Sequence, residues 1–219
     1  KKYHVYGLGN ALVDYEYLIE DKILNDFNLP KSSMTLIDDT LRTTLFKSLV
    51  HFKKKKGGGS AANTLIAMAQ LGADACYSCK VANDEDGHFY LKDLVDQGVN
   101  HHLNTEKLSN VSSGVTGTCI VLVTPDAERT MCTYLGATAQ YSATEINWDH
   151  FAQATHLYIE GYLFCSDQGT AAALKAIEFA KSKNIQIALT CSDAGVVEGF
   201  RARFEQALAA RVGAAHGVA

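Results

Sequence analysis

The stretch Gly57–Gly58–Gly59–Ser60–Ala61–Ala62–Asn63 decides the fold of this chain. Glycine has no Cβ, so the backbone of this stretch can come close to a ligand. The residues that follow it, Thr64–Leu71, are mostly good helix formers. The stretch therefore predicts a loop that leads into a helix N-terminus, where unpaired N–H groups and the side chain of Asn63 could meet polar ligand atoms. A tight turn that only allows close helix packing is the alternative.

The composition is that of an ordinary globular protein. The 219 residues are 47% hydrophobic and 20% charged, with a formal net charge of −4. This length suits one large or two modest domains, and the charge is not the basic excess typical of nucleic-acid binding. The sequence has no apolar run of bilayer length and no apolar signal segment at its start. Its six cysteines lie among apolar residues, as buried reduced thiols do, so we expect a cytoplasmic protein, monomeric or homodimeric, that binds neither nucleic acid nor membrane.

Strand and helix patterns alternate along most of the chain. The expected strands of a main sheet are Tyr3–Gly9, Asp74–Val81, Thr155–Ile159 and Ile185–Thr190. The expected helices are Asp39–Phe52, Thr64–Leu71, Asp86–Gln97, Gln168–Lys183 and Val197–Ala209. Such alternation predicts an α/β fold, in which helices cover both faces of a parallel sheet.

Three further segments, 11–20, 34–37 and 117–135, have strand patterns without helices between them. They predict a small accessory sheet that lies over one end of the main sheet as a lid. Ligands of open α/β sheets bind beyond the carboxyl ends of the strands. The residues expected at or beside such positions are Asn10, Gly58, Gly59 and Glu160.

Single polar residues in this pattern are candidates for ligand contacts. Asp14 follows a buried strand and could accept two hydroxyl hydrogen bonds, as a polyol requires, whereas a turn Asn10 and a surface Asp14 are the alternative. Glu160 closes an expected strand just before a glycine, which is a good binding position. Arg129 follows a turn and could either pair with nearby acids or reach an anionic group.

Other motifs are interpreted as structural. Gly7–Leu12 begins like a dinucleotide-binding fingerprint, but leucine stands where the third glycine is required. Cys76 and Cys79 lie three apart in an expected strand and therefore point to opposite faces. Asn83–Gly87 lacks the preceding acidic residue of an EF-hand, so Asp84 is expected to cap the next helix. A solvated surface is expected for Lys53–Lys56, and a surface loop for His101 and His102.

Taken together, these motifs resemble the ribokinase family of PfkB-type carbohydrate and nucleoside kinases, from about Tyr3 to about Leu208. The segments that carry the resemblance are, in order, Gly9–Asp14, Gly58–Asn63, Asn83–Gly87, Glu128–Met131, Tyr158–Tyr162 and Leu189–Asp193. The spacing from Asn10 to Asp14 and the run Glu128–Met131 are most similar to the adenosine-kinase-like branch.

The resemblance implies a Rossmann-like three-layer αβα core with a small β-sheet lid. It also implies transfer of the γ-phosphoryl group of ATP, with Mg²⁺, to a primary hydroxyl of an adenosine-like nucleoside or a sugar. The substrate-binding residues that it implies are Asn10, Asp14, Gly58, Gly59, Asn63, Arg129 and Glu160. The side chains that could flank a purine are Tyr15, Tyr17, Leu36 and Tyr134, and they favour a nucleoside over a free sugar.

One part of the family pattern is absent from the sequence. The family's general base is an Asp in a Gly-Ala-Gly-Asp motif, and neither that motif nor the metal-linked Asn-x-x-Glu motif occurs here; Gly213–His216 is no substitute. We therefore assign no catalytic or metal-binding residue, and we expect residues 1–219 to be an incomplete ribokinase-like domain without its ATP site. A fragment, a longer protein with omitted segments and a degenerate homologue would each explain this. The functional alternatives are a sugar kinase of the same family and a binding module without catalysis, whereas Leu12 argues against an NAD-linked oxidoreductase.

Overall fold

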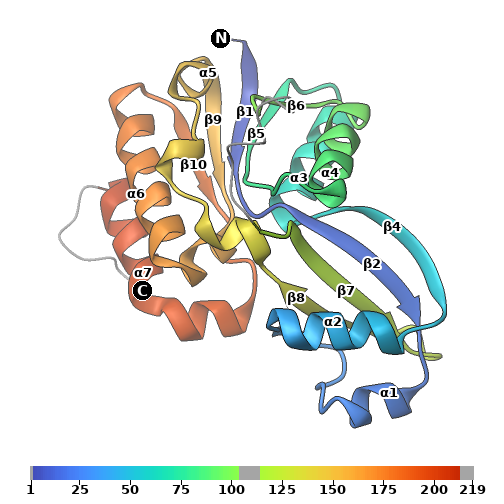
Figure 1. Cartoon of the computed structure of the whole chain (residues 1–219). Helices are drawn as coiled ribbons and strands as arrows, with labels where there is room; N and C mark the ends of the chain where they lie inside the picture. The colour runs from blue at the N-terminus through green and yellow to red at the C-terminus, as the bar shows by residue number, and fades with distance from the viewer. Residues whose placement is uncertain (1, 104–113, 213–219) are drawn as a thin grey trace.

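The computed structural model describes residues 2–103 and 114–212, which form two five-stranded sheets and their covering helices (Figure 1). The first sheet is parallel throughout. Its strands, in spatial order, are β10 (Gln186–Leu189), β9 (Ala154–Ile159), β1 (Tyr3–Leu8), β5 (Ala75–Ser78) and β6 (Val99–His101). The central strands β1 and β5 are almost entirely buried, as expected of a parallel sheet covered on both faces.

Helices cover both faces of this sheet and complete the expected three layers (Figure 1). On one face lie α3 (Ser60–Gln70) and α4 (Glu85–Asp96). On the other face lie α5 (Trp148–Ala152), α6 (Asp167–Ser182) and α7 (Ala194–Val212), together with the 3₁₀ turns η2 (Gly136–Gln140), η3 (Ala143–Glu145) and η4 (Gly161–Cys165). The α/β fold predicted from the alternating pattern is confirmed.

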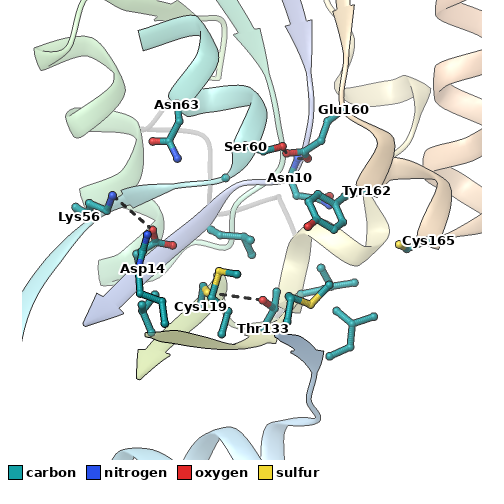
Figure 2. A pocket seen from close by; sticks show the side chains of 18 residues that line it. Asn10, Asp14, Lys56, Ser60, Asn63, Cys119, Thr133, Glu160, Tyr162 and Cys165 are labelled. Atoms are coloured by element: carbon teal, nitrogen blue, oxygen red, sulfur yellow. Dashed lines mark hydrogen bonds and ion pairs between the residues drawn. The ribbon is translucent and has the colours of Figure 1, made fainter. Parts of the chain in front are cut away.

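The second sheet gathers the segments that broke the alternation. Its spatial order is β3 (Met34–Leu36), β8 (Arg129–Tyr134), β7 (Gly117–Val123), β2 (Leu12–Leu18) and β4 (Phe52–Gly58). Two helices, α1 (Asp21–Asp26) and α2 (Asp39–Ser48), cover one of its faces through a core that includes Leu45, Ile120 and Cys132. The opposite face of this sheet carries no helix and lines a pocket against the main body (Figure 2).

The two sheets meet where the chain passes from one to the other. The Ala11 amide donates to Thr138 Oγ1 at 3.2 Å, and the Ala137 amide donates to the Val115 carbonyl at 2.8 Å. The Tyr90 hydroxyl of α4 donates to the Gly58 carbonyl at 3.0 Å. The first two bonds join the segments that precede β2, precede β7 and follow β8, and the third joins the end of β4 to α4.

Strand β4 corrects one expectation and adds to another. The helix predicted over Asp39–Phe52 ends at Ser48, and the lysine run Lys53–Lys56, expected to be a solvated surface, forms a strand in which Lys53 and Lys54 are exposed. Lysine is a poor strand former, but here each lysine has an acidic partner on a neighbouring element. Lys53 and Lys54 pair with Glu16 at 3.2 and 3.3 Å. Tertiary pairing with β2 therefore overrides the local preference.

Smaller corrections concern element boundaries and two histidines. Helix α3 begins at Ser60, so Asn63 lies in its first turn instead of in the loop before it. His101 belongs to β6, and His102 bonds the Glu145 carbonyl at 2.6 Å, so neither lies in a free surface loop. Asp84 caps α4 as predicted, by accepting from the Gly87 amide at 2.8 Å. The motif at 213–216 lies outside the described residues.

All six cysteines are free thiols, including the buried Cys76 and Cys79, which agrees with the structural interpretation of that motif. Among residues 2–103 and 114–212, no helix combines the length and apolar character that a bilayer crossing requires.

Candidate functional site

The open face of the second sheet presents side chains in cross-strand rows. Residues paired across neighbouring strands point to the same face, so the register identifies the members of each row. One row is Leu36, Thr133, Cys119, Asp14 and Lys56. The next row is Met34, Met131, Val121, Glu16 and Lys54. Each row therefore runs from an apolar side chain at β3 to charged side chains at β2 and β4.

Apart from Glu16 and Lys54, the side chains of these rows form one wall of a cavity of about 230 Å³ between the second sheet and the main body (Figure 2). Six of the seven predicted substrate-binding residues line it: Asn10, Asp14, Gly59, Asn63, Arg129 and Glu160. Gly58 does not line the cavity, but it lies directly behind Asp14, where an added Cβ would be 2.1 Å from Asp14 Oδ1. Only glycine leaves room for that carboxylate.

Asp14 is the least exposed of the three charged side chains that line the cavity on this wall, the others being Lys56 and Arg129. Its side chain is 14% exposed, and Lys56 Nζ lies 3.9 Å from Asp14 Oδ2. Burial raises the pKa of Asp14 to about 6, while the charges of Lys56 and Arg129 oppose the rise. At neutral pH the Asp14 side chain is therefore mostly ionised and accepts hydrogen bonds. Hydrogen-bond donors from a ligand would further stabilise the carboxylate.

The glycine stretch that was predicted as a ligand-binding loop is instead the end of β4, which leads directly into α3 through Gly59. Gly59 has φ +93°, and a Cβ at this position would lie 2.5 Å from the Asn10 carbonyl. Gly59 is also the N-cap of α3 and has no side chain with which to cap it. Asn63 projects from the first turn of α3 toward the cavity (Figure 2).

Glu160 follows β9 and is 1% exposed. Its Oε2 accepts from the Asn10 amide at 2.7 Å, and its Oε1 accepts from the Ser60 hydroxyl at 2.5 Å and from the Ala61 amide at 3.0 Å. Burial raises the pKa of Glu160, and these hydrogen bonds oppose the rise. The first-turn amides of α3, which we expected to face a ligand, are thus bound by a carboxylate of the protein.

Asn10 is also held by its surroundings. It is 6% exposed, its carbonyl accepts from the Tyr77 hydroxyl at 3.1 Å, and its Oδ1 accepts from Thr138 Oγ1 at 3.2 Å. Arg129, in contrast, is exposed at the start of β8, on the same wall as Asp14. The cavity thus combines a buried, hydrogen-bonded polar corner at Asn10 with an exposed cation, Arg129, at its rim.

The prediction that four side chains could flank a purine is wrong for three of them. Tyr15 and Tyr17 point to the α2 side of the sheet, where each packs edge-on against Phe46. Tyr134 lies on that side too, under the Arg42 guanidinium. Leu36 alone lines the cavity. Both faces of β2 and β8 carry large side chains, so alternation did not show which face would be open.

The structure adds cavity residues that the sequence analysis did not select: Leu12, Met34, Lys56, Ser60, Cys119, Val121, Met131, Thr133, Leu135, Tyr162 and Cys165. Most of them are strand positions that alternate with residues of the covered face. A correct register for β2, β7 and β8 would have identified them. Tyr162 and Cys165 come from η4, for which the sequence carries no comparable signal.

Comparisons with known proteins agree with this geometry. The model of the pfkB family carbohydrate kinases matches residues 32–211. Guanosine-inosine kinase of Escherichia coli (strain K12) is 29% identical over 197 residues, which are 85% of this chain and 44% of that protein. The crystal structure of adenosine kinase from Sinorhizobium meliloti superposes with a TM-score of 0.87 at 31% identity, over 95% of this chain and 62% of that one. A probable sugar kinase from Rhizobium etli CFN 42 gives a TM-score of 0.85 at 28% identity, over 98% of this chain and 68% of that one. The chain therefore spans less than half of the curated relative and about three fifths of the adenosine kinase structure.

Proposed function

Because this chain belongs to the pfkB family of carbohydrate kinases, we propose that the full-length protein transfers the γ-phosphoryl group of ATP to the primary hydroxyl of a purine nucleoside. The relatives that match are longer than these 219 residues, so the activity is proposed for a protein of their length. Phosphoryl transfer depends mostly on positioning and charge stabilisation. The chain's own contribution is the positioning of the substrate.

The observation that carries the proposal is the two-sided character of the cavity. Its polar corner holds Asn10, Asp14 and Asn63, and its opposite end is lined by Met34, Leu36, Val121, Met131 and Leu135. A nucleoside has the same division, because its sugar carries hydroxyls and its base has large apolar faces. A free sugar would satisfy the polar corner and leave the apolar end without a partner.

We assign the residues roles on this basis. The Asp14 carboxylate accepts hydrogen bonds from sugar hydroxyls, and the side-chain amides of Asn10 and Asn63 complete the polar corner. Gly58 and Gly59 let the backbone and the Asp14 carboxylate lie close to the sugar. Arg129, on the rim of the cavity, attracts the anionic group of the reaction.

ATP and Mg²⁺ belong to the proposal for the whole protein. When bound, they supply the phosphoryl group and the charge that neutralises it. The part of the chain that the structure describes has no group of three His, Cys, Asp or Glu side chains able to hold a metal ion. The sequence also lacks the general-base motif, so the residues described here bind and orient the substrate, and no chemical step is assigned to them. The free state of all six cysteines supports the cytoplasmic location.

A binding experiment on the 219-residue chain tests the site. Adenosine, guanosine, inosine, ribose and fructose would be titrated by calorimetry into the wild type, Asp14→Ala and Tyr134→Phe. We expect a nucleoside to bind more tightly than either sugar, Asp14→Ala to weaken it at least about tenfold, and Tyr134→Phe to leave it unchanged because Tyr134 faces α2. Binding of a sugar with no binding of any nucleoside would contradict the nucleoside assignment and favour the sugar kinase.

A binding module without catalysis is the second candidate, because the cavity offers contacts for a nucleoside and no chemical step is assigned to its residues. Incubation of the chain with ATP, Mg²⁺ and the tightest-binding nucleoside, followed by chromatography of the products, separates the two for this chain. A full-length protein that binds the nucleoside and forms no nucleoside monophosphate would establish the binding module.

A further inference from the structure

The Glu160 carboxylate is held by hydrogen bonds from the protein itself. Three donors lie within 3.0 Å of its oxygens, namely the Asn10 amide, the Ser60 hydroxyl and the Ala61 amide. An ionised carboxylate offers about four lone-pair sites, so these donors occupy most of its hydrogen-bonding capacity.

These donors come from two loops that are distant in sequence. Ser60 and Ala61 open α3, whose N-cap Gly59 has no side chain to satisfy the free amides of the first turn. Glu160, which follows β9, supplies that cap from outside the helix, and its negative charge is favourable at a helix N-terminus. The start of α3 is therefore fixed by a residue of another element.

The other loop joins β1 to β2. Glu160 Oε2 holds it through the Asn10 amide. Gly9 permits this approach, because a Cβ there would lie 2.9 Å from Glu160 Oε2 and 2.6 Å from the Tyr77 hydroxyl oxygen. The carboxylate thus packs against a backbone segment that has no room for a Cβ at position 9.

We propose that Glu160 is a positioning residue that ties the Gly9–Asn10 loop to the first turn of α3 and thereby holds Asn10, Gly59 and Asn63 in place. This assignment depends on the proposed function only for the identity of the ligand. It replaces the expectation that Glu160 contacts the substrate directly. Loss of the carboxylate would leave amides of both loops unpaired and allow the loops to separate.

The test compares Glu160→Gln with Glu145→Gln in the 219-residue chain. Glu145 is a matched control, because it also accepts from the backbone and hydroxyl of Ser142, at 2.7 and 2.8 Å, and it does not line the cavity. NMR would follow the shifts and hydrogen exchange of the Asn10 and Ala61 amides without ligand. We expect Glu160→Gln to move both resonances and to raise both exchange rates roughly tenfold or more, and Glu145→Gln to leave them unchanged.

A second variant, Ser60→Ala, keeps the test decisive if Glu160→Gln does not fold. Ser60 and Asn10 share the Glu160 carboxylate, so Ser60→Ala should also speed exchange at the Asn10 amide. Adenosine affinity, measured in parallel, should fall about tenfold in Glu160→Gln. Lost affinity with unchanged exchange would show direct contact and overturn the proposal, as would faster exchange with unchanged affinity. If the wild type binds no nucleoside or sugar, the proposed function fails, and unchanged amide exchange in both variants would separately refute the tie between the loops.

Discussion

Replacement of Asp14 by asparagine should make the free protein more stable and its ligand binding weaker. The carboxylate is 14% exposed, on a wall whose other side chains are largely apolar, with its nearest ion-pair atom, Lys56 Nζ, 3.9 Å away. An asparagine has nearly the same shape and no charge to desolvate. The position therefore serves the ligand at the expense of the fold, as binding sites commonly do.

The size of the effect follows from the pKa. Burial raises the pKa of Asp14 from 3.8 to about 6, so the folded chain binds the proton more tightly than the unfolded chain does. This tighter proton binding stabilises the fold fully below pH 3.8, and the stabilisation is lost as the pH rises through about 6. That interval corresponds to about 3 kcal/mol at most, and loss of the Lys56 attraction reduces the expected gain of Asp14→Asn at pH 7.5 to about 1–2 kcal/mol.

Urea unfolding at pH 4.5, 6.0 and 7.5 would measure this gain. The single tryptophan, Trp148, packs against Phe151 and Phe179 and provides the fluorescence signal. The advantage of Asp14→Asn over the wild type should be largest at pH 7.5 and shrink toward pH 4.5. Asp126→Asn is the control of opposite sign, because hydrogen bonding to Lys31 lowers the pKa of Asp126 to about 2.

Two results would refute this reasoning about Asp14. One is an Asp14→Asn variant that is less stable than the wild type at pH 7.5. The other is a stability difference that does not vary with pH, since the predicted gain arises from ionisation alone. In the same samples adenosine affinity should fall at least about tenfold, because the amide presents one acceptor oxygen where the carboxylate presents two.

Three further predictions concern the same region. Gly58→Ala should weaken adenosine binding by roughly tenfold or more in calorimetry, since its Cβ would displace the Asp14 carboxylate; wild-type affinity would contradict the assigned role of Gly58. Lys56→Met should raise the pKa of Asp14 further, because an opposing charge is removed, and so shift the pH midpoint of adenosine binding upward; an unchanged midpoint would show that Lys56 has no influence on the site. Asp84→Ala should lower the free energy of unfolding by about 2 kcal/mol in urea, because it removes the α4 cap and the hydrogen bonds from Thr116, and a loss below about 0.5 kcal/mol would disagree with that network.

The parts of the fold that the sequence predicts well are those where local pattern and final environment agree. β1 and β5 are buried on both faces, so their apolar runs are continuous and recognisable. β4 was missed because its lysines are stabilised by acids on β2 and α4, which no local window contains. β6 was missed because it has only three residues and ends in a histidine.

The candidate site divides in the same way. Asn10 and Asn63 were selected from an expected turn and loop, and Asp14 from its place after a buried strand, and the structure brings all three to one cavity. The face to which Tyr15 and Tyr134 point was predicted wrongly, because it depends on where α2 lies. The hydrogen bonds that hold Glu160 could not be foreseen either, since its partners Asn10 and Ser60 lie 150 and 100 residues away.

The second sheet also constrains how the chain reaches its native state. Its central strands β2 and β7 are neighbours that pair Leu12 with Gly117. Strand β5, which lies between them in the sequence, pairs with β1 in the other sheet. Contacts at such sequence separation form late, because a long loop must close before they contribute stability. The parallel sheet closes a longer loop still, because β1 and β9 pair Tyr3 with Ala154. The cavity lies between the two sheets, so its shape depends on long-range pairings in both of them, and loss of either pairing would deform it.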